Sequence, residues 1–353
     1  RDNEPKDVNR VINNIDSKKW DEMSVACRAW YQQNCSVEGS FYTTKMIIQK
    51  FYMGDRLPKV FVDANRLNTY GPPHGSSLGN KILHLFFILK YCFKHKLQPV
   101  VPVKSNLDNL FDLSNIFENN SKCDNIAFVE KTAYKIKGEH KSTIENSKNQ
   151  FNEEHKFLEE LTLPSTIDFS IRGHFTHKRL MPLLNEFEKF ISIHKHLIEE
   201  ILSRYKTIQN EDNVCIHYRG TDFARHECGL GNLVLPEDYY KYSIFEMERL
   251  LQKNLTYHIF SDEPDKIIKM LPKDKNYIIH RDTPELDWVS LFLCRNLISS
   301  NSSFSWTASL FNKKIVTQPK GWLNMKYNKY KGNIPYDYRV PHSIEINYLE
   351  NQP

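Results

Sequence analysis

From residue 210 onward, short segments typical of strands alternate with segments typical of helices, and this alternation constrains the fold more than any other feature of the sequence. The predicted strands lie at 214–218, 256–260, 277–280, 296–300 and 314–317. The predicted helices lie between them, at 237–252, 264–271, 286–294 and 303–311. Because helices supply the crossovers that parallel strands require, this order predicts an α/β fold with a parallel sheet covered on both faces.

A shorter unit of the same kind precedes this region. It comprises a predicted strand at 59–64, a glycine-containing loop at 71–80, a buried helix at 82–94 and a second strand at 98–103. Residues 104–165 predict loops and short helices, and residues 177–206 predict a helix that is interrupted or kinked near Pro182. We therefore expect a helical N-terminal extension at 1–57, an N-terminal α/β domain at 58–208, a C-terminal α/β domain at 209–340 and a tail at 341–353.

The charge and the cysteines exclude several classes of protein. The chain carries 48 Lys and Arg against 43 Asp and Glu, a net charge of +5, and lacks a dense basic stripe with interleaved aromatic residues. We therefore expect no nucleic-acid partner, whereas a phosphorylated small molecule or an anionic membrane surface fits this mild excess. The seven cysteines form no CxxC pair, which argues against a zinc site and a disulfide framework.

Compartment follows from the same composition. No stretch reaches the roughly 18 to 20 apolar residues that a membrane span requires. The cysteine usage favours a reducing compartment. We expect a cytoplasmic protein, with peripheral membrane association as a second option, or a lumenal protein if an N-terminal anchor has been removed.

Polar side chains follow the strand predicted at 214–218, in the run His217-Tyr-Arg-Gly-Thr-Asp222. Ligands of open parallel sheets bind beyond the carboxyl ends of the strands, so we expect a ligand near His217, Arg219, Thr221 and Asp222. A guanidinium can form paired, charge-assisted hydrogen bonds to a diphosphate. The alternative is a surface Arg219 that only pairs with Asp222.

A second polar cluster follows the strand predicted at 296–300. Asn301, Ser302 and Ser303 stand between that strand and the next helix, with Phe304 directly after them. The first N–H groups of a helix favour phosphate, whereas helix capping by a serine is the simpler alternative. Asn301 also begins an N-glycosylation sequon, which cannot be used if it is buried at such a site.

Five further residues are candidates on weaker patterns. Gly79 and Asn80 precede the predicted helix at 82–94, and there a backbone can approach a ligand closely, although a plain turn explains them equally. Asp262 follows the strand at 256–260, and Asp287 opens a helix where its carboxylate could accept two donors from a guanine edge. Glu227 lies ten residues after His217 and is a candidate general base.

These motifs resemble those of a known group of enzymes. The run Asp287-Trp-Val-Ser-Leu-Phe-Leu-Cys-Arg-Asn-Leu-Ile-Ser-Ser-Asn-Ser-Ser-Phe-Ser-Trp306 is similar to the C-terminal signature of α-1,2-fucosyltransferases, and Gly79-Asn80 to their N-terminal Leu-Gly-Asn element. The run from His217 to Asp222 resembles a motif shared by α-1,2-, α-1,6- and protein O-fucosyltransferases. The resemblance extends over roughly residues 57 to 325, although short motifs carry it.

The resemblance implies two Rossmann-like domains that face a cleft, the GT-B arrangement, with GDP-fucose bound mainly by the second domain. It implies that Arg219 holds the diphosphate, that His217 and Asp287 lie near the guanosine, and that the remaining donor contacts come from Ser302, Ser303, Phe304, Gly79 and Asn80. It further implies inversion at the anomeric carbon without a metal ion or other cofactor. The expected partners are therefore a nucleotide-sugar donor and a glycan acceptor.

The chain departs from the resemblance at one position. Many members have two consecutive arginines in the motif, and here the second position is Gly220. The primary hypothesis is an inverting transfer of L-fucose to a glycan hydroxyl, as an α-1,2 linkage to a galactoside, with Arg219 and Glu227 as the catalytic residues. The alternatives are an enzyme of the same fold that uses another nucleotide sugar, and a non-catalytic glycan-binding relative.

Overall fold

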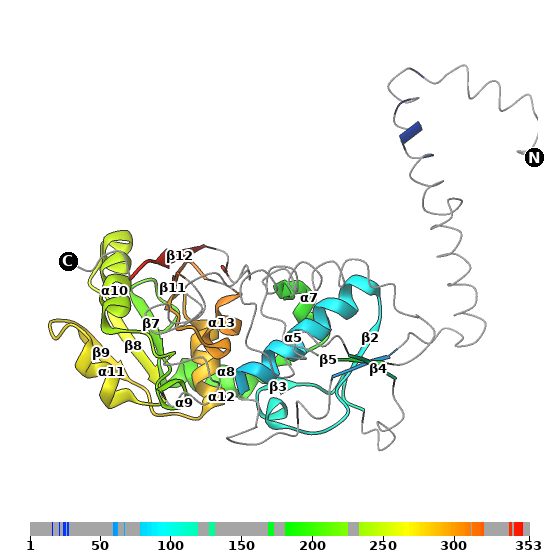
Figure 1. The fold of residues 1–353 in the computed structure, drawn as a ribbon, viewed down its shortest axis with the longest axis horizontal. Helices are drawn as coiled ribbons and strands as arrows, with labels where there is room; N and C mark the ends of the chain where they lie inside the picture. Colours follow the sequence, from blue (N-terminus) through cyan, green and yellow to red (C-terminus); the bar gives the residue numbers. More distant parts are fainter. Residues whose placement is uncertain are drawn as a thin grey trace, which may run out of the picture. The chain divides into compact units, whose positions relative to one another are not determined.

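A computed structural model of the chain shows two compact units, Arg1–Pro58 with Thr162–Ile167 and Lys59–Leu161 with Asp168–Pro353. It describes residues 59–62, 78–118, 127–130, 169–172, 181–224, 233–311, 313–320, 339–340 and 342–348, with isolated positions at 16, 21, 24, 25, 27 and 67. For 127–130, 169–172 and 222 only the backbone is described. Apart from the positions before residue 59, these residues belong to the second unit (Figure 1). The helical extension predicted at 1–57 therefore lies almost wholly outside the described residues, and the expected domain boundary at 208 stays a prediction.

The first sheet of this unit has four parallel strands in the order β2-β1-β5-β4. Its strands are β1 (Lys59–Phe61), β2 (Gln98–Val100), β4 (Ala127–Glu130) and β5 (Phe169–Arg172). The first two strands were predicted from the sequence. Strands β4 and β5 are only four residues long each, and the sequence did not predict them.

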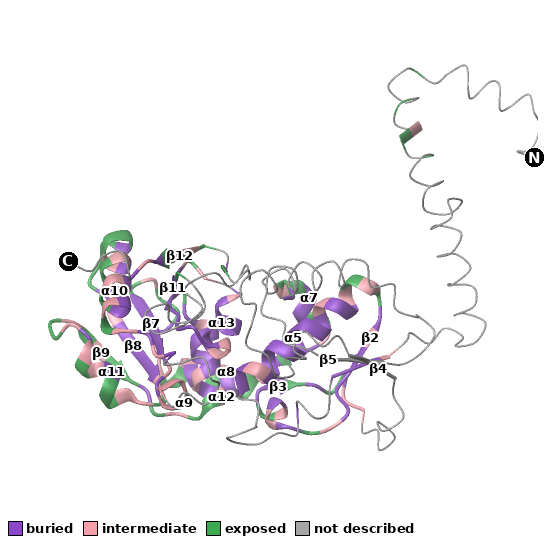
Figure 2. Cartoon of the chain, in the orientation of Figure 1, coloured by how far each residue is buried: buried purple, intermediate pink, exposed green. Residues whose placement is uncertain are grey.

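Helix α5 (Leu78–His95) connects β1 to β2 and is buried on almost every side (Figure 2). Its apolar residues are not confined to one face, because the helix packs between other elements rather than against a single one. The predicted start at residue 82 is wrong, since the helix begins at Leu78 and includes Gly79 and Asn80 in its first turn. The buried Lys81 is compensated, because its Nζ donates to Asn106 Oδ1 over 2.9 Å.

The described residues of the connection to the second half form short elements. They are η1 (Asn106–Asn109), β3 (Phe111–Asp112), α7 (Leu184–Glu188), β6 (Ser192–Ile193) and α8 (Lys195–Arg204). The helix predicted for 177–206 is interrupted, but after Glu188 and not near Pro182, because β6 pairs antiparallel with β3 between α7 and α8. A tertiary strand pair thus overrides the local helix propensity.

The second sheet has six parallel strands in the order β12-β11-β10-β7-β8-β9. The strands are β7 (Asn213–Tyr218), β8 (Thr256–Ser261), β9 (Asn276–Ile279), β10 (Asn296–Ile298), β11 (Ile315–Pro319) and β12 (Ser343–Ile346). The parallel sheet and the α/β class predicted from the alternation are confirmed. Strand β12 comes from the segment expected as a tail and pairs with β11 at the edge of the sheet.

Helices cover both faces of this sheet (Figure 1). They are α9 (Thr221–Ala224), α10 (Glu237–Leu251), α11 (Pro264–Met270), α12 (Pro284–Leu293) and α13 (Ser303–Ser309). Val214, Ile216 and Tyr218 of β7 pack with α10, because alternate side chains of a strand point to one face. On the other face, Trp288 of α12 packs edge-on against Phe86 of α5, with ring centroids 6.4 Å apart.

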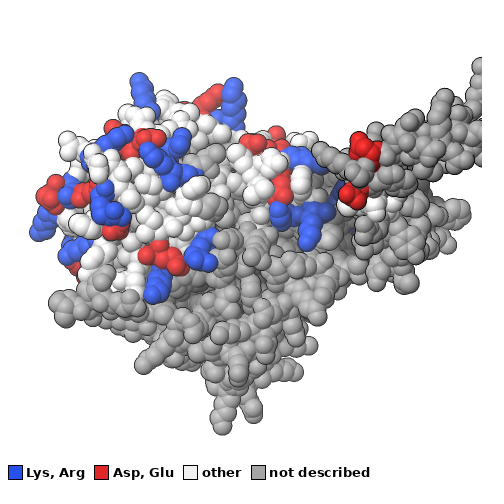
Figure 3. All heavy atoms as spheres, turned by 90° about the horizontal axis from the view of Figure 1, so that it is seen from above, with Lys and Arg blue, Asp and Glu red and all other residues white. Residues whose placement is uncertain are grey.

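Charged side chains of both signs are intermixed on the described surface. On the face drawn in Figure 3, described lysines and arginines lie among described aspartates and glutamates. Several form pairs one helical turn apart, such as Lys241 with Glu237 and Arg249 with Glu246. Among the described helices, none combines the length and the apolar character that crossing a membrane requires.

Candidate functional site

The order of the strands creates a switch point at β7. From β7 the chain builds β8 and β9 on one side, and then returns to build β10, β11 and β12 on the other side. In open α/β sheets, ligands bind beyond the carboxyl ends of the strands at such a point. There the ends of β7 and β10 are joined by a hydrogen bond of 2.7 Å between His217 Nδ1 and Ser300 Oγ. The two motifs found in the sequence therefore meet at one edge of the sheet.

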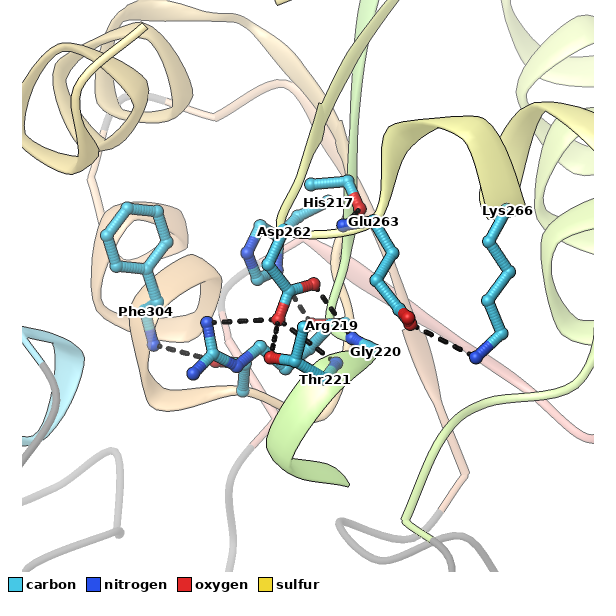
Figure 4. A network of polar contacts seen from close by, with 11 residues as sticks. His217, Arg219, Gly220, Thr221, Asp262, Glu263, Lys266 and Phe304 are labelled. Atoms are coloured by element: carbon cyan, nitrogen blue, oxygen red, sulfur yellow. Dashed lines mark hydrogen bonds and ion pairs between the residues drawn. The ribbon is translucent and has the colours of Figure 1, made fainter. Parts of the chain in front are cut away.

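The loop after β7 is held by a carboxylate from the neighbouring strand. Asp262 Oδ1 accepts from the Gly220 N–H over 2.9 Å, and its Oδ2 accepts from the Thr221 N–H over 3.2 Å and from Thr221 Oγ1 over 2.6 Å. Arg219 Nη1 lies 3.3 Å from the same Oδ2. Figure 4 shows these three residues grouped around the carboxylate.

The charge of Asp262 follows from these contacts. Burial by itself would raise the pKa of the carboxyl, but the Thr221 hydroxyl, the Arg219 guanidinium and the two backbone N–H groups together hold the pKa below its usual value. Asp262 is therefore ionised at neutral pH and faces only donors. The alternative in which Arg219 only pairs with Asp222 is not tested, because the side chain of Asp222 lies outside the described residues.

His217 is buried beside this loop and stacks on Phe304 of α13, with ring centroids 5.3 Å apart and an interplanar angle of 27°. Burial, and then the Arg219 guanidinium, lower the pKa of His217 to about 3. The imidazole is therefore neutral at neutral pH. It can orient a ligand by hydrogen bonding and stacking, but it brings no positive charge to an anion.

The serine cluster serves mainly to build the start of α13. Ser302 caps the helix, because its Oγ accepts from the Phe304 N–H over 3.3 Å. Asn301 is buried and donates from Nδ2 to the Leu233 carbonyl over 2.9 Å, so the sequon that begins there is inaccessible to glycosylation. For Ser302, helix capping is therefore the role that the structure shows.

Gly79 and Asn80 contact the same helix start from α5. Ser303 Oγ donates to Asn80 Oδ1 over 2.7 Å. A Cβ added at Gly79 would lie 2.5 Å from the backbone nitrogen of Phe304 and 2.7 Å from its Cα. The absence of a side chain at Gly79 therefore allows α5 to approach α13, and this contact joins the two sheets. A donor contact for Gly79 and Asn80 stays a prediction.

Comparison with known proteins decides the family. The model of the family described as Glycosyl transferase family 11 matches residues 129–335, which is more than half of the chain. The chain belongs to glycosyl transferase family 11. This family 11 protein is thus a glycosyltransferase, as the sequence predicted.

This family 11 glycosyltransferase is also similar to individual proteins. The O-antigen biosynthesis glycosyltransferase WbnK of Escherichia coli is 28% identical over 129 residues, which span 34% of this chain and 42% of WbnK. Among solved structures, the fucosyltransferase NodZ from Bradyrhizobium has 13% identity and a TM-score of 0.42 over 72% of this chain and 93% of its own. POFUT1 in complex with GDP-fucose has 12% identity and a TM-score of 0.41 over 73% and 95%. Values this low transfer neither a ligand nor an activity.

Asp287 of this family 11 enzyme has an unusual environment at the start of α12. Its Oδ1 is buried and has no hydrogen-bond partner among the described residues. Burial, and then the nearby Asp282 and Glu285, raise the pKa of Asp287 to about 7. A buried carboxylate oxygen without a donor is costly, and a carboxyl with such a shifted pKa is a candidate for a functional role.

One sequence candidate cannot be placed. Glu227 lies outside the described residues. At Gly220, an added Cβ would lie 1.9 Å from Glu263 Oε2. In this family 11 enzyme, the Glu263 carboxylate therefore fills the space that a side chain at position 220 would need. Glu263 itself pairs with Lys266 over 3.0 Å. Ser300 and Glu263 were not predicted as site residues, although each stands next to a predicted one, Asn301 and Asp262.

Proposed function

We propose that this family 11 glycosyltransferase moves L-fucose from GDP-fucose to a hydroxyl of a glycan, with inversion at the anomeric carbon and an α-1,2 linkage to a galactoside. The observation that carries the proposal is the position of Arg219, which Asp262 holds at the switch point of the sheet in a chain that matches family 11. WbnK is an O-antigen biosynthesis glycosyltransferase, and this similarity supports a glycan acceptor.

Arg219 supports binding of the donor diphosphate. Its guanidinium stands directly after β7, where the loop backbone is fixed by Asp262, and its side chain is 30% exposed. Guanidinium groups bind phosphate oxygens in pairs through charge-assisted hydrogen bonds. The neutral His217 next to it leaves Arg219 as the cation that this loop contributes among the described residues.

Asp287 supports guanine as the base of the nucleotide. Guanine presents two adjacent donors, N1–H and the 2-amino group, and a carboxylate accepts such a pair with its two oxygens. The unpartnered Oδ1 of Asp287 supplies this acceptor in a buried position. Uracil presents only one N–H at its pairing edge, so the same carboxylate favours GDP over UDP.

In the proposed reaction, the acceptor hydroxyl oxygen forms a bond to C1 of the fucose while the bond from C1 to the β-phosphate oxygen breaks. The leaving GDP gains negative charge, which Arg219 stabilises by charge-assisted hydrogen bonds. The hydroxyl proton passes to a general base, for which Glu227 is our candidate. We propose that no metal ion or other cofactor takes part.

The test is a screen of nucleotide sugars for release of nucleoside diphosphate, with and without galactoside acceptors. We expect GDP release from GDP-fucose that depends on the acceptor, and a loss of about 100-fold or more in kcat/KM for Arg219→Ala. Arg249→Ala is the matched control, because Arg249 pairs with Glu246 on the exposed face of α10. Full turnover in Arg219→Ala, or release of UDP instead of GDP, would reject the assignment.

One observation favours another nucleotide sugar as the alternative donor. Gly220 replaces the second arginine of the motif, and the space beside it is occupied by the Glu263 carboxylate. A site with one arginine fewer and a carboxylate nearby binds a diphosphate less strongly. Stabilisation of the protein by UDP but not by GDP in a thermal-shift assay would favour this alternative. Acceptor binding without turnover of any donor would instead favour the non-catalytic hypothesis.

A further inference from the structure

We infer that Asp262 is a positioning residue of the donor site, which holds Arg219 and the backbone of residues 220–221 in the geometry that binds a diphosphate without itself touching the donor. This inference rests on the proposed function. It replaces the direct donor contact expected of Asp262 by an indirect role, in which the carboxylate orients the loop after β7.

Strand register places Asp262 opposite the loop. Strands β7 and β8 pair in parallel with His217 opposite Phe260 and Tyr218 opposite Ser261. Asp262 directly follows the end of β8, and Arg219 directly follows the end of β7. Because the register continues from a buried strand pair, the carboxylate comes to lie beside the loop through the backbone and not through a flexible side chain.

The turn that carries Asp262 is itself fixed. Ser261 Oγ accepts from the Glu263 N–H over 2.8 Å, and α11 begins at Pro264 directly afterwards. Proline at the first helical position restricts the backbone there. The carboxylate therefore has little freedom to move away from the loop.

The four donors around Asp262 account for its acceptor capacity. A carboxylate offers about four lone-pair sites. Those of Asp262 accept from the Gly220 N–H, the Thr221 N–H and the Thr221 hydroxyl, and the Arg219 guanidinium forms an ion pair with the same carboxylate. An incoming sugar or ribose hydroxyl thus finds these sites already used. Figure 4 shows that Glu263 and Lys266 form a separate pair that does not include Asp262.

A positioning role of Asp262 predicts that its replacement weakens binding of ligands with phosphate groups only. In Asp262→Asn, the amide keeps the shape of the carboxylate, but its NH₂ group replaces an acceptor oxygen. Two donors then face each other, so the loop and Arg219 shift. Binding of GDP depends on Arg219, whereas binding of guanosine, which lacks phosphates, does not. A general loss of structure would weaken both ligands equally.

The experiment measures the dissociation constants of GDP and guanosine by calorimetry for the full chain and for Asp262→Asn. We expect Asp262→Asn to weaken GDP about tenfold or more and guanosine less than about twofold, with Arg219→Ala showing the same pattern. Asp265→Asn is the control, because Asp265 also pairs with an arginine, Arg281, over 2.9 Å but lies one helical turn further on. It should leave both constants unchanged.

Thr221→Val covers the case in which Asp262→Asn does not fold, because it removes only the 2.6 Å hydrogen bond to the carboxylate. It should weaken GDP by a few-fold and spare guanosine. Equal weakening of the two ligands, or unchanged GDP binding in both variants, would overturn the positioning role while the proposed function stands. Absence of GDP binding by the unmodified chain would instead overturn the proposed function and this inference with it.

Discussion

Asp287→Asn should stabilise the free protein and at the same time impair recognition of guanine. The pKa of Asp287 is raised from 3.8 to about 7, because burial and the neighbouring Asp282 and Glu285 disfavour the carboxylate. Its ionised form is therefore costly in the folded protein and free of that cost in the unfolded chain. Asparagine has nearly the shape of the neutral acid and avoids the cost.

The magnitude follows from linkage. The folded pKa lies above the unfolded value, so Asp287 costs no stability below pH 3.8, and its cost grows as the pH rises towards 7. At about 1.4 kcal/mol per pH unit, the loss amounts to roughly 1.6 kcal/mol at pH 5 and to about 4 kcal/mol at pH 8 as an upper limit. Asp287→Asn should therefore raise the free energy of unfolding in urea more at pH 8 than at pH 5.

The same variant tests the base. Inosine diphosphate lacks the 2-amino group of GDP, so the unmodified protein should bind GDP about 10- to 100-fold more tightly, the equivalent of one charge-assisted hydrogen bond. In Asp287→Asn this preference should fall below about threefold. Glu285→Gln is the matched control, because it removes a neighbouring charge and keeps the acceptor. If Asp287→Asn binds GDP and inosine diphosphate as the unmodified protein does, or gains no stability at pH 8, the role of Asp287 is refuted.

Two further predictions concern the contact between α5 and α13 and the absence of a metal requirement. Gly79→Ala should lower the free energy of unfolding in urea by about 1–3 kcal/mol, because the new Cβ would lie 2.5 Å from the Phe304 nitrogen. Asn80→Ala should cost only about 1 kcal/mol, the loss of one hydrogen bond; equal effects in the two variants would contradict the packing explanation. A chelator at millimolar concentration should leave turnover of GDP-fucose unchanged, since Arg219 provides the cation in our proposal, and a loss restored by added Mg²⁺ or Mn²⁺ would contradict it.

The C-terminal sheet could be predicted well because its pattern is local. Each strand from β7 to β11 is a short apolar run between an amphipathic helix and a turn, so its position follows from the sequence alone. Strand β12 was missed because it depends on pairing with β11 at the sheet edge. The interruption of 177–206 by β6 was missed for the same reason, since only the distant β3 makes Ser192–Ile193 a strand.

The candidate site divides along the same line. That His217 and Ser300 come together could be expected, because both follow parallel strands and such strands end at one edge. The ion pair between Arg219 and Asp262 could not be predicted. Asp222 lies three residues from Arg219 in the sequence and is an equally plausible partner, whereas Asp262 lies 43 residues away. Choosing between them requires the register of β7 and β8, which the sequence does not reveal.

The structure also changes what Gly79 means. In the sequence it stands in a glycine-containing loop, where close approach of a ligand is the natural explanation. In the structure it lies in the first turn of α5 and allows that helix to contact the backbone of Phe304, while Phe304 stacks on His217. One glycine in the first half of the chain thus fixes the aromatic ring that lies against the motif histidine of the second half. A residue can therefore belong to a binding site through the packing that it permits, even where it forms no contact with the ligand.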